Sequence, residues 1–295
     1  MNTKLKDIVI VVESGADFPS DLAKKYGVEI VPMHVIFDDV DECDGQFPVS
    51  KIIEYHHDTN KIPKTSAANV KDYHDLFEKI HQMYPDKKIL HLCYSAVTTA
   101  TFQNALIASE GLDYVYHIDT KYLSAGQTLI VLKACIYIKK YPDHELHQLI
   151  TFVEEIISKT HMSFIPQQLD FLKAGGRVSN AAYLGANVLK LKPVIELIDG
   201  KLICTKKYRG SDYARLCLKL VREMTQIYGY DKKDVTLVYT VGLEDEIKKA
   251  IEHEIKLMGF ENIYWLQAGG VITSHGGPNG FGLHFVKSKK RHCLF

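Results

Sequence analysis

Small hydroxyl side chains stand at four places in the first half of the chain where an anion could bind. Ser14 and Ser95 lie at the ends of apolar, strand-like runs, and Thr65 and Ser124 lie shortly before segments of helical patterning. In a parallel sheet such positions meet at the carboxyl ends of the strands, where ligands bind. Hydroxyls and helix N-terminal amides hold an anion without a desolvated cation, which would cost on the order of several kcal/mol. The pattern predicts an anion-binding collar with almost no fixed charge.

Two glycine-rich segments contain further candidate functional residues. Gly175-Gly176 permits backbone angles that a Cβ forbids, so it ends a helical turn over 169–173 and places Arg177 on an exposed loop. A guanidinium displayed in this way binds carboxylate or phosphate groups. His275 is the only histidine in a run dense in glycine over 269–283. That density indicates either tight turns or a close approach of the backbone to another group.

Patterns typical of metal, nucleotide and hydrolase sites are missing from the sequence. The six cysteines show no CxxC pair and no zinc-like spacing, so most of them are expected to be buried thiols. Walker, dinucleotide-binding, HExxH and GxSxG motifs are also absent. The acidic segment 38–42 lacks the ligand spacing of a calcium loop and is expected to be a solvated turn. We expect neither a metal nor a cofactor.

Composition and charge argue against several classes of function. The 295 residues suffice for two modest domains or one large one, and 46% hydrophobic with 24% charged residues is ordinary for a globular protein. Because 36 Lys+Arg balance 36 Asp+Glu, net charge gives no reason to bind nucleic acid or anionic membranes. The sequence shows neither a secretion signal nor a run of membrane-spanning length. We expect a cytoplasmic protein, monomeric on its own and without stable membrane insertion.

Strand-like and helix-like segments alternate in the first half, which predicts a parallel, doubly wound α/β domain over residues 1–160. The expected strands are 7–12, 29–37, 88–94 and 114–118, and the expected helices are 17–26, 49–58, 70–84, 98–109, 124–139 and 144–160. The pair Thr65-Ser66 precedes the third of these helices, and it could instead serve as an N-cap.

Residues 161–295 are expected to form a C-terminal α/β domain with a mixed sheet. Its expected strands are 162–165, 194–198, 202–208, 235–239 and 263–266, and its expected helices are 180–191, 212–228 and 243–258. Asp199-Gly200 suits a two-residue type I′ turn, which predicts a hairpin over 194–208. The segment 180–191 is apolar at helical spacing, which is typical of core packing and is also compatible with lining a ligand cavity.

Two segments of the second half carry a resemblance to a known family. The first consists of Leu169-Asp170-Phe171-Leu172-Lys173-Ala174-Gly175-Gly176-Arg177-Val178, followed by Leu191-Lys192-Pro193-Val194-Ile195 and Asp199-Gly200. The second consists of His275, Gly277 and Pro278, in a His-x-Gly-Pro arrangement. Together they resemble the signatures of the DegV family of bacterial fatty-acid-binding proteins.

The resemblance extends through the first half with some replacements. Residues 13–19 are similar to the opening Asp-Ser motif of the family, with Glu13 in place of Asp, and Thr65-Ser66 matches its Thr-Ser element. The stretch 95–105 resembles its Ser-Ser-x-x-Ser-Gly-Thr element, and Asp119 with Ser124-Ala125-Gly126 fits as well. In the 95–105 stretch the second Ser, third Ser and Gly are replaced by Ala96, Thr99 and Ala100.

This resemblance implies a DegV-like fold, with the carboxylate-binding hydroxyls in residues 1–160 and the lipid tail and partner-docking surface in residues 161–295. It implies that the chain is not itself an enzyme but holds a long-chain fatty acid non-covalently and presents the carboxyl group to a separate, ATP-dependent fatty acid kinase subunit. The implied carboxylate-binding residues are Thr65, Ser95, Ala96, His275 and Gly276, with Ser66 and Ser124 as further pocket residues. Arg177 and His275 are the expected contacts with the kinase subunit.

An enzyme remains the alternative hypothesis. Ser95 as nucleophile and His275 as base could serve a hydrolase or acyltransferase that acts on lipid esters. Ser95 lacks a nucleophile elbow, however, and no acid is clearly placed to orient His275. A regulatory or DNA-binding function has little support, because no predicted helix is markedly basic.

Overall fold

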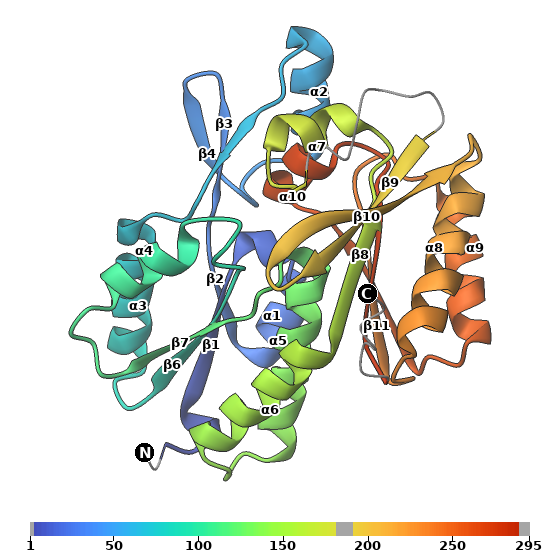
Figure 1. Ribbon diagram of the computed structural model, residues 1–295. Helices are drawn as coiled ribbons and strands as arrows, with labels where there is room; N and C mark the ends of the chain where they lie inside the picture. Colours follow the sequence, from blue (N-terminus) through green and yellow to red (C-terminus); the bar gives the residue numbers. More distant parts are fainter. Residues whose placement is uncertain (1–2, 181–190, 289–295) are drawn as a thin grey trace.

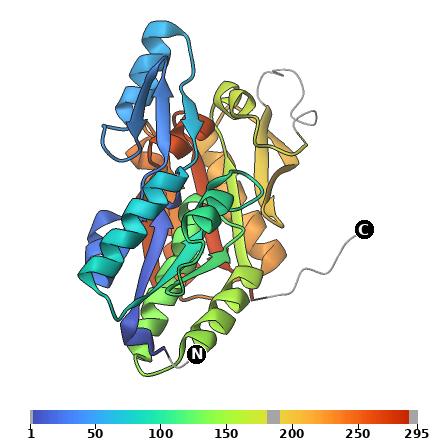
Figure 2. The same ribbon diagram turned by 90° about the vertical axis from the view of Figure 1, so that its left-hand side faces the viewer.

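The structure is a computed structural model that describes residues 3–180 and 191–288. Two large sheets lie side by side with helices between and around them, and a small three-stranded sheet stands at one end (Figure 1 and Figure 2). Most of the predicted helix 180–191 falls on residues 181–190, outside the described residues. Within the described ranges, no helix has both the length and the apolar character needed to cross a membrane.

The first sheet is parallel throughout, in the order β2-β1-β6-β7. Its strands are β1 (Ile8–Glu13), β2 (Val28–Val31), β6 (Lys88–Cys93) and β7 (Val115–Asp119). The helices that connect or follow them are α1 (Ser20–Tyr26), α3 (Val70–Met83), α4 (Thr101–Ala108), α5 (Ser124–Lys140) and α6 (Leu146–Lys159). β1 is buried along its whole length, as its β-branched composition suggests for a strand covered on both faces. The predicted parallel, doubly wound sheet is confirmed.

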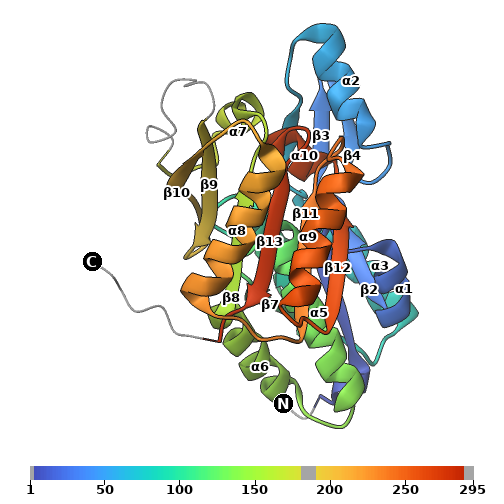
Figure 3. The ribbon, with the colours of Figure 1, turned by 90° about the vertical axis from the view of Figure 1, so that its right-hand side faces the viewer.

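The second sheet is mixed, in the order β10-β9-β8-β13-β11-β12, which confirms the predicted sheet type. Its strands are β8 (Thr160–Ile165), β9 (Leu191–Ile198), β10 (Lys201–Arg209), β11 (Asp234–Tyr239), β12 (Asn262–Gln267) and β13 (Phe281–Val286). Helices α8 (Tyr213–Tyr228) and α9 (Asp245–Leu257) cover one of its faces (Figure 3). The β9–β10 hairpin turns through Asp199 and Gly200, both at positive φ, as the type I′ turn requires.

Helix α5 lies between the two large sheets. It packs against β8, β11 and β13, and its residues from Ser124 to Cys135 are buried on every side. A helix enclosed in this way has no solvent-facing polar stripe, and its buried polar side chains need partners, as Lys133 has in Asp234. Thr236 on β11 donates to the carbonyl of Ala125 at 2.8 Å, and this bond fixes the start of α5 against the second sheet.

A three-stranded antiparallel sheet, ordered β4-β3-β5, corrects the prediction of one strand over 29–37. That segment divides into β2 and β3 (His34–Phe37), which belong to different sheets. The break falls at Pro32, which has no N–H for a ladder bond. Next to it, the N–H of Met33 leaves the ladder and donates to Oγ of Ser14 at 3.0 Å.

The other two strands of the small sheet correct two local expectations. The exposed acidic segment over 38–42 forms the hairpin tip and the start of β4 (Val40–Cys43) instead of a turn alone. Thr65 and Ser66 lie in β5 (Lys64–Ser66), so the N-cap alternative is wrong. Asn69 caps α3 instead, in a reciprocal capping box with Asp72. The hairpin is followed by α2 (Ser50–Thr59).

The glycine-rich segment near the C-terminus forms two elements that periodicity does not predict. These are the short helix α10 (Gly270–Gly276) and the central strand β13. α10 packs against α7 (Leu169–Gly175) and against the small sheet. α7 ends as predicted, because Gly176 adopts the left-handed conformation at its C-terminus.

Candidate functional site

One cavity lies where α10, the small sheet, the N-terminus of α5 and the second sheet meet; we call it the apolar cavity. The space free of atoms there amounts to about 950 Å³, part of it open to solvent. Its apolar walls include Met162, Phe164, Leu172, Leu202, Val271 and Phe281. Its polar lining includes Thr65, Ser66, Ser124, Arg177, His275 and His284. A mostly apolar wall with a few polar groups suits a ligand that has a long apolar part.

Thr65 and His275 hydrogen-bond to each other in the wall of the apolar cavity. Oγ1 of Thr65 on β5 lies 2.8 Å from Nε2 of His275 in the last turn of α10. Gly276, the next residue, also lines the cavity. Three of the five residues predicted to bind a carboxylate therefore meet at one place, although they come from opposite ends of the chain.

The imidazole of His275 is neutral near pH 7. Burial, and secondarily the charge of Arg177, lower the pKa of His275 to about 4. Within the described ranges its Nδ1 atom is buried without a hydrogen-bond partner. A Cβ on Gly175 would lie 2.3 Å from that atom, so α7 can pack here only with glycine at this position. A neutral ring donates from one nitrogen and accepts at the other, which suits a hydrogen-bonding role.

Two carboxylates that sequence reasoning missed hold the N-terminus of α10. Oδ1 of Asp17 accepts a hydrogen bond from the N–H of Gly269, and Oδ1 of Asp44 accepts one from the N–H of Gly270, both at 2.8 Å. The first N–H groups of a helix lack partners within the helix, and carboxyl oxygens can accept from them. Burial raises the pKa of Asp17 to about 8, and the neighbouring Asp44 adds to the increase. No local pattern could reveal these contacts, because they join residues 252 and 226 positions apart.

Two hydroxyls of the predicted collar donate hydrogen bonds to these carboxyl groups. Ser14 donates to Oδ2 of Asp44 at 2.9 Å, and Ser124 donates to Oδ2 of Asp17. The predicted collar therefore contains two carboxyl groups that were not expected there, and that of Asp17 keeps its proton near pH 7. Ser124 still lines the apolar cavity, but its hydroxyl proton already has an acceptor.

Ser95 and Ala96 are not brought into the lining that contains Thr65 and His275. Ser95 is fully buried, and its hydroxyl donates to the carbonyl of Gly200 at the tip of the β9–β10 hairpin, at 2.8 Å. The N–H of Ala96 donates to Oδ1 of Asp119 at 3.2 Å. Both hydrogen-bonding groups are thus occupied within the protein, and their contact with a carboxylate stays a prediction.

Arg177 and Ser66 stand at the exposed side of the apolar cavity. Arg177 is exposed, as its Gly-Gly loop predicts, and its Nη1 donates to the carbonyl of Gly175 at 2.6 Å. The same side chain contributes to the lining, so its guanidinium lies near both solvent and cavity. Ser66 also lines the cavity and is exposed.

The alternative nucleophile pair of Ser95 and His275 gains no support from this geometry. The hydroxyl of Ser95 is directed to Gly200, and Nε2 of His275 faces Thr65. Nδ1 of His275 lacks a carboxylate partner among the residues that the structure describes, so its ring is not oriented as in a catalytic triad.

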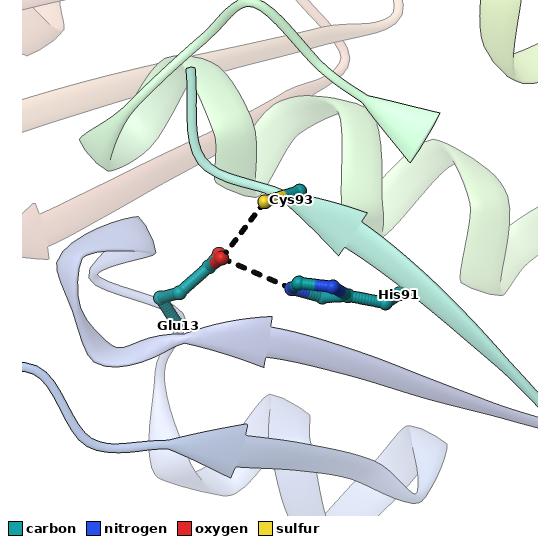
Figure 4. Close-up of side chains that lie close together, drawn as sticks. All are labelled: Glu13, His91 and Cys93. Carbon is teal, nitrogen blue, oxygen red and sulfur yellow. Dashed lines mark hydrogen bonds and ion pairs between the residues drawn. The ribbon is translucent and has the colours of Figure 1, made fainter. Parts of the chain in front are cut away.

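A second cluster, outside the apolar cavity, contains three potential metal ligands. Glu13, His91 and Cys93 place their ligand atoms within 4.8 Å of one another in the interior (Figure 4). Oε1 of Glu13 lies 3.0 Å from Nε2 of His91 and 3.1 Å from Sγ of Cys93, and it accepts from the hydroxyl of Tyr73 at 2.7 Å. These are hydrogen-bond distances, and all three partners are donors.

The other oxygen of Glu13 is also satisfied. It accepts from the N–H of Tyr94 at 2.9 Å and from the amide of Gln127 at 3.0 Å. Burial alone would raise the pKa of Glu13, but His91 and the other donors lower it to about 2. Burial raises the pKa of Cys93 well above its usual value, so the thiol keeps its proton. A metal would have to displace that proton and break these bonds, so the cluster fits a structural hydrogen-bond network better than a metal centre.

Comparisons with known proteins agree with this architecture. A family model described as "Uncharacterised protein, DegV family" matches residues 7–288. A DegV domain-containing protein from Caldanaerobacter subterraneus is 26% identical over 287 residues, which cover 95% of this chain and 99% of that protein. A DegV domain-containing protein from Clostridium acetobutylicum is 28% identical over 296 residues, with 96% and 99% covered.

Solved structures show the same fold. A DegV family protein from Thermus thermophilus, described by its fatty acid binding, superposes with a TM-score of 0.84 at 24% identity and covers 95% of this chain and 99% of its own. A stearic acid-binding protein from Eubacterium ventriosum gives a TM-score of 0.83 at 22% identity, with 94% and 97% covered.

Proposed function

The chain belongs to the DegV family, and from this premise we propose that it binds one long-chain fatty acid non-covalently in the apolar cavity. The observation that carries the proposal is the cavity itself, an apolar space with the Thr65–His275 pair in its wall. Each CH₂ group moved out of water contributes about 0.8 kcal/mol, so a long acyl chain supplies ample gross affinity without a buried ion pair. The fatty-acid-binding relatives are consistent with this reading.

We assign the carboxylate end to Thr65, His275 and Gly276. If Nε2 of His275 carries the proton, it donates to Oγ1 of Thr65 and leaves the hydroxyl proton of Thr65 free for the ligand. A hydroxyl that donates to a carboxylate makes a strong, charge-assisted bond. Ser66 and Ser124 are further pocket residues in this assignment, and Ser95 with Ala96 would join it if the β9–β10 hairpin moved away from Ser95.

We propose further that the bound acid is a substrate for a separate kinase subunit rather than for this chain. The sequence has no phosphate-binding loop, so ATP must be held by a partner that phosphorylates the carboxyl group. Arg177 suits the contact with that partner, because an exposed guanidinium can bind a carboxylate or phosphate group on another protein. His275 would act on the same carboxyl group through Thr65, because donation to Oγ1 polarises the Thr65 hydroxyl.

Mass spectrometry of the purified protein tests the first part of the proposal. Denaturation should release a stoichiometric fatty acid, and the mass of the chain itself should remain unmodified. A chain that carries no lipid and binds none after incubation with long-chain acids would refute it. Hydrolysis of lipid esters that is abolished by Ser95→Ala would support the enzyme alternative instead.

Reconstitution tests the second part. The lipid-loaded chain, ATP and a fatty acid kinase subunit should together form an acyl phosphate, and neither protein should do so alone. Acyl phosphate formation by this chain and ATP without a partner would overturn the assignment to a separate kinase.

A further inference from the structure

His284 is a polar residue in the lining of the apolar cavity, on a different element from Thr65 and His275. It lies on β13 with no exposed surface, and it is part of the cavity lining. Two glycines make room for its ring: a Cβ on Gly282 would lie 3.2 Å from Cε1 of His284, and a Cβ on Gly126 would lie 3.5 Å from Cδ2. Nε2 is bonded to both of these carbons, so it sits in the space between the two glycines.

The hydrogen bonding of the ring defines which nitrogen carries the proton. Nδ1 of His284 lies 3.1 Å from the carbonyl oxygen of Thr236, and a carbonyl oxygen can only accept. Nδ1 is therefore the donor, and Nε2 has a free lone pair. Burial lowers the pKa of His284 to about 4, so the ring stays neutral near pH 7. Among residues 3–180 and 191–288, Nε2 has no hydrogen-bond partner.

The neighbours of His284 on β8 and beside Gly282 are apolar. Met162 faces His284 across the β8–β13 ladder, and Phe164 and Val238 contact the neighbouring Gly282 position. These side chains are apolar. A buried water needs two to four polar partners, and the nearest walls do not supply them. A buried acceptor without a donor costs free energy, which a ligand could recover by supplying the donor.

We propose that Nε2 of His284 accepts a hydrogen bond from a hydroxyl group on the acyl chain, so that the cavity selects a hydroxylated long-chain fatty acid. This inference rests on the proposed fatty-acid-binding function. Gly280, the residue before β13, lies beside Gly276, because a Cβ on Gly280 would be 3.7 Å from the carbonyl oxygen of Gly276. Four strand residues span about 13 Å, so the hydroxyl belongs well along the chain and not next to the carboxylate.

The same geometry predicts discrimination between two oxygen-bearing tails. A hydroxyl donates to the lone pair of Nε2, whereas a ketone presents only lone pairs of its own and would be repelled. The preferred order is therefore the hydroxy acid, then the unsubstituted acid, then the oxo acid. A cavity without a hydrogen-bond acceptor at this position would bind the hydroxy and oxo acids with similar affinity.

Competition binding on the full-length, delipidated protein tests the proposal. The probes are octadecanoic acid, its monohydroxy derivatives with the hydroxyl moved along the chain, and the matching oxo acids. We expect one hydroxyl position to bind several-fold to about tenfold tighter than octadecanoic acid, the effect of one neutral hydrogen bond. His284→Leu should abolish that preference, and Leu283→Met, an apolar exchange on the other face of β13 and outside the cavity lining, should retain it.

A second readout does not depend on the variant folding. In the unmodified protein, the ¹⁵N resonance of His284 Nε2 should shift when the preferred hydroxy acid binds and shift much less with octadecanoic acid. Equal affinity for octadecanoic acid and all hydroxy acids, or a preference that survives in His284→Leu, would overturn the inference but leave fatty acid binding intact. If none of the acids binds, both the inference and the proposed function fail.

Discussion

Oγ1 of Thr65 and Nε2 of His275 lie 2.8 Å apart, although 210 positions separate the two residues in the sequence. The contact joins β5 of the small sheet to the last turn of α10. The contact also couples the Thr65 hydroxyl to the His275 ring. If Nε2 of His275 donates to Oγ1 of Thr65, the hydroxyl proton of Thr65 must point to another acceptor. We therefore expect the pair to act as one unit in binding a carboxylate.

Thr65→Ala should weaken fatty acid binding with little effect on folding, because Thr65 is only partly buried. A hydrogen bond to a charged group contributes about 1.5–3 kcal/mol, so affinity should fall about tenfold or more. Displacement of a bound fluorescent fatty acid measures the change. Thr151→Ala, which removes an exposed hydroxyl on α6, is the matched control. The double variant Thr65→Ala/His275→Ala should lose little more than the worse single variant.

Ser95→Ala is also expected to weaken lipid retention, but it has a second consequence that Thr65→Ala lacks. The carbonyl of Gly200 loses its buried donor, which should lower the free energy of unfolding by about 1–3 kcal/mol. Chemical denaturation and lipid occupancy, measured on the same preparation, separate the two effects. Reduced stability with full occupancy would show that Ser95 only holds the hairpin.

Gly175→Ala should displace the His275 ring, which packs against Gly175. The new Cβ would lie 2.3 Å from Nδ1 of His275, so the ring must move and its bond to Thr65 must lengthen or break. We expect a loss of fatty acid affinity comparable to that of Thr65→Ala, about tenfold. Ala174→Ser, an exposed change in the same helix, should bind normally. Unchanged affinity in Gly175→Ala would show that the position of His275 does not matter for the ligand.

Arg177→Ala should separate lipid binding from phosphorylation. The side chain is exposed, and arginine is enriched among the few interface residues whose truncation costs about 2 kcal/mol or more, so acyl phosphate formation with the kinase subunit should fall about tenfold or more. Lipid occupancy should stay nearly unchanged. Arg209→Ala, at the exposed end of β10, serves as the comparison. Because Arg177 also lines the apolar cavity, loss of lipid instead would assign it to the carboxylate.

Asp17→Asn should flatten the pH dependence of stability. The pKa of Asp17 is about 8 in the folded protein, against an ordinary value of 3.8. Between these values the folded state holds a proton that the unfolded state lacks, so this group's stabilisation is lost as pH rises from about 4 to about 8.

The substitution is compatible with the backbone, because Asn tolerates the left-handed conformation that Asp17 adopts at a φ of 55°. Above about pH 8 the variant should be more stable than the unsubstituted protein. Urea denaturation across this pH range measures the effect, with Asp21→Asn on the exposed face of α1 as the control. Parallel pH profiles for Asp17→Asn and the unsubstituted protein would contradict the prediction.

Features that depend on neighbouring residues could be predicted from the sequence. The apolar, β-branched run of β1 predicts a buried parallel strand, and Asp199-Gly200 predicts the β9–β10 hairpin. Gly176 predicts the end of α7 and the exposure of Arg177. In each case a few residues prefer particular backbone angles or burial, and this preference is enough to specify the strand, the turn or the helix end.

The site depends on contacts that local preferences do not encode. A hydroxyl at a strand end predicts a hydrogen bond but not its partner, so Ser95 could be expected at the ligand although it donates to Gly200. Likewise nothing near Asp17 in the sequence indicates that it holds Gly269. The sequence by itself determined most of the helices and strands and the polar residues available. Only the tertiary structure decided which of them meet, because packing brings together groups hundreds of positions apart and pairs most buried donors with acceptors.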